Sequence, residues 1–271
     1  MALYERILIT GAAGRLGSEL RKGLAPLANT IRLAGRTPFS DLAEHEEQVV
    51  FDLSDMKATI AATEACDAIV HFGGAALECS WQTILNSNIR GSYHIYEGAR
   101  KHGARRVIYA SSVHAIGYYK LEDHISVEAP VRPDSLYGVS KNFVESLSRL
   151  YWDKFGIESA CLRIFSSFPK PADRRMLWSY LSFNDCVRLT TAALTAPRIS
   201  HTVTFGLSNN TVKVVDNSGA NHLGYLPQDC SEPWKAEIEA STEIPDPNRS
   251  SVKYLGGWFC ELDHPDDKES E

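Results

Sequence analysis

Short runs of apolar residues alternate with longer amphipathic stretches along the first 165 residues of this 271-residue chain. Six runs have the length and composition of buried strands, namely residues 6–10, 30–34, 48–51, 68–72, 106–110 and 158–164. Between them, helical spacing of apolar residues is found at residues 18–27, 81–102 and 137–155. Strands that alternate with helices predict an α/β fold in which helices cover both faces of a parallel sheet.

The second part of the chain has fewer regular apolar patterns. Residues 185–196 predict one more helix and residues 201–205 one more strand, while prolines and charged residues interrupt the remainder. We therefore predict a Rossmann-type doubly wound sheet in residues 1–165, followed by a small substrate-binding cap in residues 166–262 that is interleaved with the last strands. Residues 263–271 are mostly charged and predict a disordered tail.

Three glycines follow the first predicted strand and open the first predicted helix. Gly11, Gly14 and Gly17 stand where a strand must turn sharply, let its backbone approach a pyrophosphate, and pack the next helix closely. The N-terminus of that helix offers unpaired N–H groups and a positive dipole end to phosphates. Glycine spacing alone is a weak signal, because tight structural turns use glycine too. The position between a strand and a helix favours a dinucleotide site.

The end of the second strand indicates which dinucleotide binds. An acidic residue there binds the ribose hydroxyls of NAD and repels a 2′-phosphate. In this chain the position holds Gly35, with Arg36 next to it and Arg15 in the glycine loop. Because a guanidinium suits a phosphate, we predict NADP or NAD as the cofactor, with NADP favoured. The alternative is that both arginines are solvated loop residues.

The ends of the third and fourth strands supply further predicted cofactor contacts. Asp52 and Leu53 are expected beside the adenine. Phe72, Gly73 and Gly74 are expected to let the backbone pass close to the ribose and phosphates.

Tyr137 and Lys141 are four residues apart in a predicted helix, so their side chains share one face. Neither group is a useful base alone at neutral pH, because a phenol ionises near pH 10 and an ammonium slightly above it. A neighbouring cation favours the phenolate. Ser111 and Ser112, after the fifth strand, supply hydroxyls to the same end of the sheet. The set predicts redox chemistry on an alcohol or carbonyl, although a chance pair and an ordinary serine turn are the alternatives.

The glycine loop, the serine pair after a strand and the Tyr-x-x-x-Lys spacing together resemble the extended branch of the short-chain dehydrogenase/reductase superfamily. Within that superfamily the chain is similar to the uronate dehydrogenases, and the similar stretches are residues 70–74, 111–119, 132–141, 175–177 and 254–257.

The resemblance implies a mechanism for the Tyr/Lys pair. The phenolate of Tyr137 removes the substrate hydroxyl proton while hydride passes to the cofactor. Lys141 and the charge of the nicotinamide lower the pKa of Tyr137, and Lys141 also holds the nicotinamide ribose. Ser112 aligns the reacting oxygen. The resemblance further implies cofactor contacts from Leu16, Asn88, Ala110 and Ile164.

Uronate dehydrogenases oxidise the C1 hydroxyl of a cyclic hexuronate to a lactone. The resemblance implies that Arg175 binds the substrate carboxylate and that His114 and Ser166 face the substrate; a surface arginine paired with an acid is the alternative. The family pattern has Asn and Ser where this chain has Val113 and Ala76. Each change removes a hydrogen-bonding group, at about 1–3 kcal/mol for a lost contact. We therefore predict an NAD(P)-dependent oxidoreductase of this type, acting on a sugar acid, an aldose or a less polar alcohol.

Two other functions stay open. A nucleotide-sugar epimerase or dehydratase shares the fold and the Tyr/Lys pair, but the region after Ile164 leaves little room for a nucleotide diphosphate. A non-catalytic dinucleotide-binding redox sensor needs none of Ser112, Tyr137 and Lys141.

Composition and charge define the expected setting. The formal net charge is −6 and no basic stripe is present, so a nucleic-acid partner is not expected. The chain has neither a long apolar span nor a signal-peptide pattern, and its six cysteines lack metal-binding spacing, so we expect no membrane association, no metal and a cytoplasmic location. By resemblance, the helices at residues 81–102 and 137–155 pair subunits into a homo-oligomer.

Overall fold

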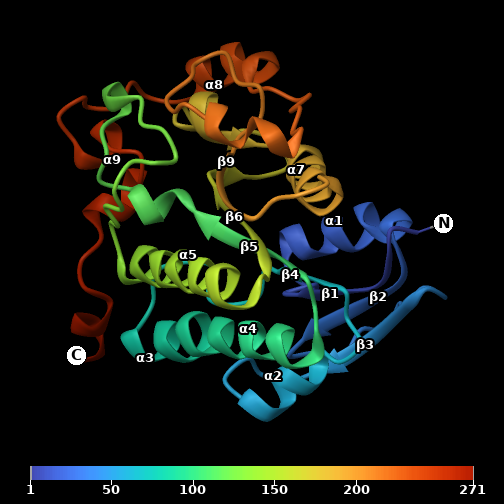
Figure 1. Ribbon diagram of the computed structural model, residues 1–271. Coiled ribbons are helices and arrows are strands. Elements are labelled where there is room, and N and C mark those ends of the chain that lie inside the picture. The colour runs from blue at the N-terminus through green and yellow to red at the C-terminus, as the bar shows by residue number, and fades with distance from the viewer. Residues whose placement is uncertain (1, 271) are drawn as a thin grey trace.

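The computed structural model describes residues 2–270, and its main feature is a seven-stranded parallel sheet between two layers of helices (Figure 1). The strands of this sheet are β1 (Tyr4–Thr10), β2 (Ala28–Gly35), β3 (Glu46–Val50), β4 (Ala68–His71), β5 (Arg106–Ser112), β6 (Glu158–Ile164) and β9 (His201–Gly206). Their order is β3-β2-β1-β4-β5-β6-β9, with β1 parallel to both β2 and β4. The order reverses between β1 and β4, which is where doubly wound sheets bind ligands. The predicted fold class is confirmed.

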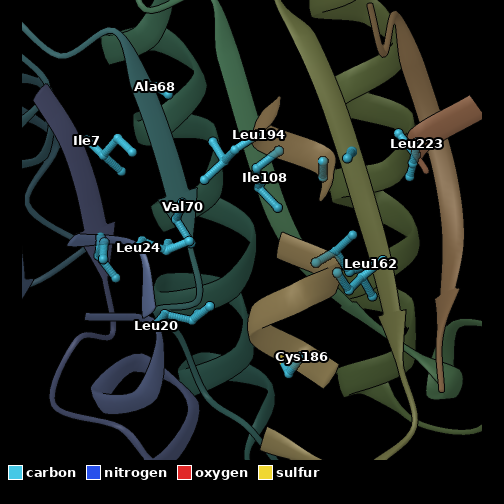
Figure 2. Packing of buried hydrophobic residues seen from close by; sticks show 14 of the residues in the cluster. Ile7, Leu20, Leu24, Ala68, Val70, Ile108, Leu162, Cys186, Leu194 and Leu223 are labelled. Atoms are coloured by element: carbon cyan, nitrogen blue, oxygen red, sulfur yellow. The ribbon is translucent and has the colours of Figure 1, made fainter. Parts of the chain in front are cut away.

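Helices cover both faces of this sheet. The α-helices are α1 (Arg15–Gly23), α2 (Met56–Ala62), α3 (Trp81–Thr83), α4 (Gly91–His102), α5 (Leu136–Phe155), α6 (Met176–Ser179), α7 (Phe183–Thr195), α8 (Lys235–Ser241) and α9 (Ser250–Lys253). On the face of α1 and α7, Leu20 and Cys186 belong to the same buried cluster as Ile108 of β5 (Figure 2). On the face of α4 and α5, Tyr96 and Val144 pack in a second cluster. Because both faces are covered, β1, β4 and β5 at the centre of the sheet contain runs of consecutive buried residues instead of an alternating pattern.

Shorter elements complete the chain. They are the π-helix η2 (Ile84–Arg90), the strand pair β7 (Ser166–Ser167) and β8 (Tyr180–Leu181), and the 3-10 helices η1 (Ala25–Leu27), η3 (Val113–Ile116), η4 (Leu121–Asp123), η5 (Ser218–Leu223), η6 (Glu232–Trp234), η7 (Gly257–Glu261) and η8 (Pro265–Ser270). In the described part of the chain no helix combines the length and apolar character that a membrane span requires.

Capping residues set both ends of α5. The Ser135 hydroxyl accepts a hydrogen bond from the Gly138 N–H at 3.0 Å, and Gly156 ends the helix at a φ of 69°, a left-handed conformation that favours glycine. The Glu78 carboxylate accepts hydrogen bonds from the N–H groups of Leu136 and Tyr137, at 3.0 and 2.7 Å. A carboxylate at this end is stabilised by the helix dipole. The loop that carries Glu78 is thereby anchored to the helix that carries Tyr137.

The predicted tail differs from the structure. Residues 265–270 form η8 instead of the predicted disordered segment, and the Asp266 carboxylate accepts a hydrogen bond from the Trp81 N–H at 3.1 Å. This contact places the end of the chain beside α3 (Figure 1). Glu271 lies outside the described residues. The charged composition of the tail concealed the order because one acidic side chain has a specific partner far away in the sequence.

Candidate active site

A cavity of about 940 Å³ runs along the carboxyl ends of the strands. Its lining starts at the glycine loop after β1, passes the ends of β2, β4 and β5, and reaches Arg175 and Trp258 in the second part of the chain. Elements far apart in sequence therefore build one site, at the edge where the strand order reverses.

The glycine loop has the shape that a dinucleotide requires. A Cβ at Gly11, which has a φ of 70°, would lie 2.7 Å from the Phe72 carbonyl oxygen, and a Cβ at Gly17 would lie 2.0 Å from the Gly11 carbonyl oxygen. Helix α1 starts after Gly14, which provides no side-chain cap. Its first N–H groups thus remain available to phosphate oxygens in the cavity. Gly11, Gly14 and Gly17 line the cavity together with Arg15 and Leu16.

The adenosine end of the cavity carries positive charge. Gly35 and Arg36 at the end of β2 line it opposite Asp52, and Arg36 is exposed. Hydrogen bonds from Ser54, and to a smaller extent the charge of Arg36, lower the pKa of Asp52. Arg15 lies over the ring of Phe168, 4.8 Å from its centroid. Arg36 is therefore the guanidinium that stands at the predicted ribose position.

The Tyr137 and Lys141 side chains are buried side by side on the cavity wall. The Lys141 ammonium lies 5.0 Å from the centroid of the Tyr137 ring and donates a hydrogen bond to the Ala110 carbonyl at 2.7 Å. The Ser112 side chain forms a hydrogen bond with Tyr137. The three residues come from β5 and α5, whose packing brings the predicted catalytic set together.

Burial dominates the titration of this pair. It raises the pKa of Tyr137 to about 12, against the lowering effect of the hydrogen bond with Ser112. It lowers the pKa of Lys141 to about 7, although the charge of Glu145 opposes this shift. Burial is thus the main cause of both shifts in the chain alone, and the lowering of the Tyr137 pKa by Lys141 and a bound nicotinamide stays a prediction.

Arg175 stands at the far end of the same cavity with its guanidinium in the protein interior. Its Nη1 donates to the Ser166 hydroxyl at 2.5 Å and its Nη2 to the Leu255 carbonyl at 2.6 Å. Burial lowers its pKa. No carboxylate of the described residues forms an ion pair with it, and its Nε has no hydrogen-bond partner among them. The alternative of a surface arginine paired with an acid is wrong.

Apolar residues form much of the remaining wall near Arg175. Val113 is buried in the lining, and Ala76 lines the cavity from the loop after β4. Leu77 and Trp258 are 57% and 53% exposed at the same cavity. His114 lies between the phenol of Tyr137 and the ring of Phe259, which stacks on it with centroids 3.6 Å apart.

The cavity includes every predicted site residue except Asn88. The cavity-lining residues among the remaining predictions are Leu53, Phe72, Gly73, Gly74, Ala110, Ile164, Ser166 and His114. Asn88 is instead buried behind the wall, where its side chain donates to the Ala75 carbonyl at 3.2 Å and to the Ser140 hydroxyl at 3.1 Å. It joins the loop after β4 to α5. Asn88 thus orders the wall of the site through these contacts, and its contribution to cofactor binding stays a prediction.

In the second part of the chain, sequence reasoning missed four aromatic lining residues, namely Phe165, Phe168, Trp258 and Phe259. They lie in the part of the chain that has little regular structure, so no periodicity marked them. The similar stretch at residues 254–257, directly before Trp258, was the available signal.

Comparison with known proteins identifies relatives over nearly the whole chain. The model of the NAD dependent epimerase/dehydratase family matches residues 7–182. A uronate dehydrogenase of Pseudomonas putida is 44% identical over 95% of this chain and 96% of its own. A crystal structure of glucuronic acid dehydrogenase from Chromohalobacter salexigens is 45% identical, with a TM-score of 0.95 over 97% of this chain and 99% of that chain. A variant of the Agrobacterium tumefaciens uronate dehydrogenase complexed with NAD is 43% identical, with a TM-score of 0.92 over 96% of this chain and 98% of that chain.

Proposed function

The chain belongs to the NAD dependent epimerase/dehydratase family, and from that premise we propose that it is an NAD(P)-dependent uronate dehydrogenase, which oxidises the C1 hydroxyl of a sugar acid to a lactone. Arg175 carries the proposal, because it is a partly buried cation without an ion-pair partner among the described residues and lines the same cavity as Tyr137. A buried charge is costly unless an opposite charge meets it. The carboxylate of a uronate supplies that charge.

Ser112, Tyr137 and Lys141 have different roles in the proposed oxidation. Ser112 and Tyr137 hold the reacting hydroxyl between them, and Tyr137 accepts its proton. The glycine loop and the end of β2 would hold an oxidised dinucleotide, which would supply the acceptor for the hydride of the carbon that bears this hydroxyl. Lowering the pKa of Tyr137 from about 12 to neutrality requires about 7 kcal/mol of differential stabilisation. The protonated form of Lys141 and the positive charge of a bound nicotinamide ring would supply it together, beside a phenol that is only 7% exposed.

The test compares uronates with the matching neutral sugars. We expect reduction of NAD or NADP, followed by absorbance, with glucuronate or galacturonate, and a kcat/KM at least about 100-fold lower with glucose or galactose, since the neutral sugars leave Arg175 without an anion. Tyr137→Phe is expected to lose about 10²- to 10⁴-fold in kcat while cofactor affinity is retained. Equal rates with neutral sugars, or undiminished turnover by Tyr137→Phe, would contradict the proposal.

We infer further that the cavity tolerates a less polar ring than glucuronate. Val113 and Ala76 offer no side-chain hydrogen bond, and Leu77 and Trp258 present apolar surface beside them. A deoxy or O-methyl uronate with a free C1 hydroxyl is then expected to lose little, about threefold or less in kcat/KM, since few polar groups are left unpaired. A loss of more than about 30-fold for all such analogues would overturn this inference.

We propose NADP as the preferred cofactor. Gly35 stands where an acid would repel the 2′-phosphate, and the exposed Arg36 beside it lines the cavity. Arg36→Ala is expected to weaken NADP binding about tenfold or more and to leave NAD binding unchanged, while Gly35→Asp reverses the preference. Calorimetric titration of each variant with both cofactors measures this. Tighter binding of NAD by the natural chain would refute the preference.

We also propose that the protein forms a homo-oligomer and lies in the cytoplasm. Val139, Phe143 and Leu150 are exposed apolar residues on one side of α5, as expected for a face that pairs with a second copy. The cysteines are free thiols, which favours a reducing compartment. The division into a core of residues 1–165 and a cap of residues 166–262 remains part of the proposal, with β9 of the cap region completing the sheet.

The two alternative functions have less support. Nucleotide-sugar epimerases and dehydratases among the solved structures, such as a UDP-galactose 4-epimerase at 20% identity, share the fold alone. A redox sensor does not require Ser112, Tyr137 and Lys141 in one buried arrangement. Both alternatives would be separated by the same assay, because neither reduces free dinucleotide with a uronate.

A further inference from the structure

Asp134 is a buried carboxylate that lies behind the cavity wall and is not needed for the chemistry described above. Its side chain is fully buried, and its Oδ2 accepts a hydrogen bond from Nδ1 of His114 at 2.8 Å. Its Oδ1 accepts a hydrogen bond from the Ser135 hydroxyl at 2.8 Å. Burying a carboxylate costs desolvation free energy, which hydrogen bonds from its partners must offset.

The backbone is shaped to admit this carboxylate. A Cβ at Gly117 and a Cβ at Gly256 would each lie 1.8 Å from Asp134 Oδ2. The two glycines are far apart in the sequence and are joined by a hydrogen bond from the Gly256 N–H to the Gly117 carbonyl at 2.9 Å. The Asp134 N–H donates to the His114 carbonyl at 3.4 Å, so main-chain and side-chain contacts join the same two residues.

The contact determines which nitrogen of His114 faces the cavity with a free lone pair. A carboxylate accepts only, so Nδ1 carries the hydrogen, and Nε2 of the neutral ring is left as an acceptor. The stacked ring of Phe259 and the edge contact with Tyr137 hold the imidazole plane. Nε2 has no hydrogen bond to any described residue, and His114 lines the cavity.

We infer that Asp134 is a positioning residue, which fixes the Nδ1–H tautomer and the orientation of His114 so that Nε2 accepts a hydrogen bond from a sugar hydroxyl next to the reacting one. The inference rests on the proposed function for the identity of the substrate. Asp134 acts through His114 and does not touch the substrate. Burial and, to a smaller extent, the charge of Asp134 raise the pKa of Tyr137 to about 12, which places the pair beside the reacting group.

The tautomer is measured first, and this measurement needs no substrate. Nitrogen-15 NMR of the ring nitrogens, assigned with His114→Asn, is expected to show Nδ1 protonated and Nε2 unprotonated for neutral His114 in the natural chain. Asp134→Asn is expected to shift the population toward the Nε2–H form, because an amide can donate to Nδ1. A predominant Nε2–H form in the natural chain overturns the inference even if no uronate is oxidised.

Kinetics with glucuronate form the second test. Asp134→Asn is expected to raise KM roughly fivefold to tenfold with kcat changed by less than about threefold, the effect of one lost hydrogen bond to bound substrate. The double variant with His114→Ala is expected to have the KM of His114→Ala alone, since Asp134 reaches the bound substrate only through the ring, whereas its charge on Tyr137 acts on kcat. Additive effects in the double variant, or an unchanged KM in His114→Ala, overturn the inference.

Asp185→Asn is the matched control. Asp185 is also a fully buried aspartate, and it pairs with Arg188 at 2.6 Å and accepts from Ser208 at 2.6 Å, but it does not line the cavity. The Asp185→Asn variant is expected to be less stable than the natural chain and to have an unchanged KM for glucuronate. If glucuronate is not a substrate of the natural chain, the proposed function fails while the NMR result still decides the role of Asp134.

Discussion

At the scale of single residues, the site depends on titratable groups that the fold removes from water. Lys141 and Tyr137 are each only 7% exposed, and burial shifts their pKa values in opposite directions, to about 7 and about 12. In both cases the neutral form is favoured before ligands bind. The Tyr137 and Lys141 pair therefore carries little charge on its own, and a bound nicotinamide ring would add a positive charge beside it.

The lowered pKa of Lys141 makes stability depend on pH. The folded pKa of about 7 lies below the ordinary value near 10.4, so the unfolded chain binds more protons between these values and stability rises with pH across this window. Lys141→Met removes this contribution. We expect the free energy of unfolding of the natural chain, relative to the variant, to rise from pH 7 to pH 10 by up to about 1.4 kcal/mol per unit.

Urea denaturation of both proteins across that range measures this difference. Tyr137 is unaltered in both proteins, so its contribution largely cancels. A difference that stays constant or falls with pH would show that Lys141 keeps its ordinary pKa.

At the scale of elements, α5 positions the site, because successive turns of its buried face contact first the cavity and then the neighbouring strands. Tyr137 and Lys141 face the cavity, and Glu145, one turn later, is 6% exposed and pairs with Arg163 of β6. The Glu145 carboxylate also accepts a hydrogen bond from the Ser111 hydroxyl at 2.6 Å. The helix thus links the reacting end of β5 to the next strand through one buried ion pair.

Replacing only Glu145 is expected to lower the free energy of unfolding more than replacing both Glu145 and Arg163. Glu145→Gln leaves the buried Arg163 without its carboxylate and should lower the free energy of unfolding by about 3–5 kcal/mol. The double variant Glu145→Gln with Arg163→Met should recover at least about half of that loss, because no buried cation remains unpaired. Chemical denaturation of the three proteins gives the comparison. Equal destabilisation in the single and double variants would mean that the pair is not electrostatically coupled.

At the scale of the whole molecule, the outer face of α5 is as informative as its inner face. The apolar repeat at Val139, Phe143 and Leu150 predicts a helix with a buried stripe, yet these residues are 43%, 38% and 47% exposed. Tyr93 of α4, at 39% exposed, extends the apolar surface. The helix is buried on the opposite side, through Val144, Ser148 and Tyr151.

Assembly is tested with one charge on this face. Phe143→Glu is expected to convert the proposed oligomer to a monomer, because a carboxylate in an apolar interface is not solvated. Light scattering after gel filtration measures the mass. Leu226→Glu is the control, since Leu226 is 77% exposed away from α4 and α5 and should leave the mass unchanged. A natural chain that is already monomeric would refute the oligomer.

Local patterns predicted most of the frame. All seven strands of the sheet, with β9 predicted at residues 201–205, and the helix that holds Tyr137 and Lys141 follow from local patterns, because these patterns reflect burial against a covered sheet. The glycine loop was readable since it needs backbone shapes that only glycine allows. Boundaries were less exact, as at residues 81–102, where the predicted helix divides into α3, the π-helix η2 and α4.

By itself the sequence determined the fold class, the cofactor end and the identity of the Ser112, Tyr137 and Lys141 set, because each rests on contacts between residues that are close in sequence or on motifs with fixed order. Only the tertiary structure decided which side of α5 is buried, that Asn88 stands behind the wall, and that Phe259 and Asp134 hold His114 beside Tyr137. Those features depend on contacts between different elements, such as Asn88 with Ser140 or His114 with Phe259, or come from loops without periodicity. Their position depends on packing and burial, which no local pattern records.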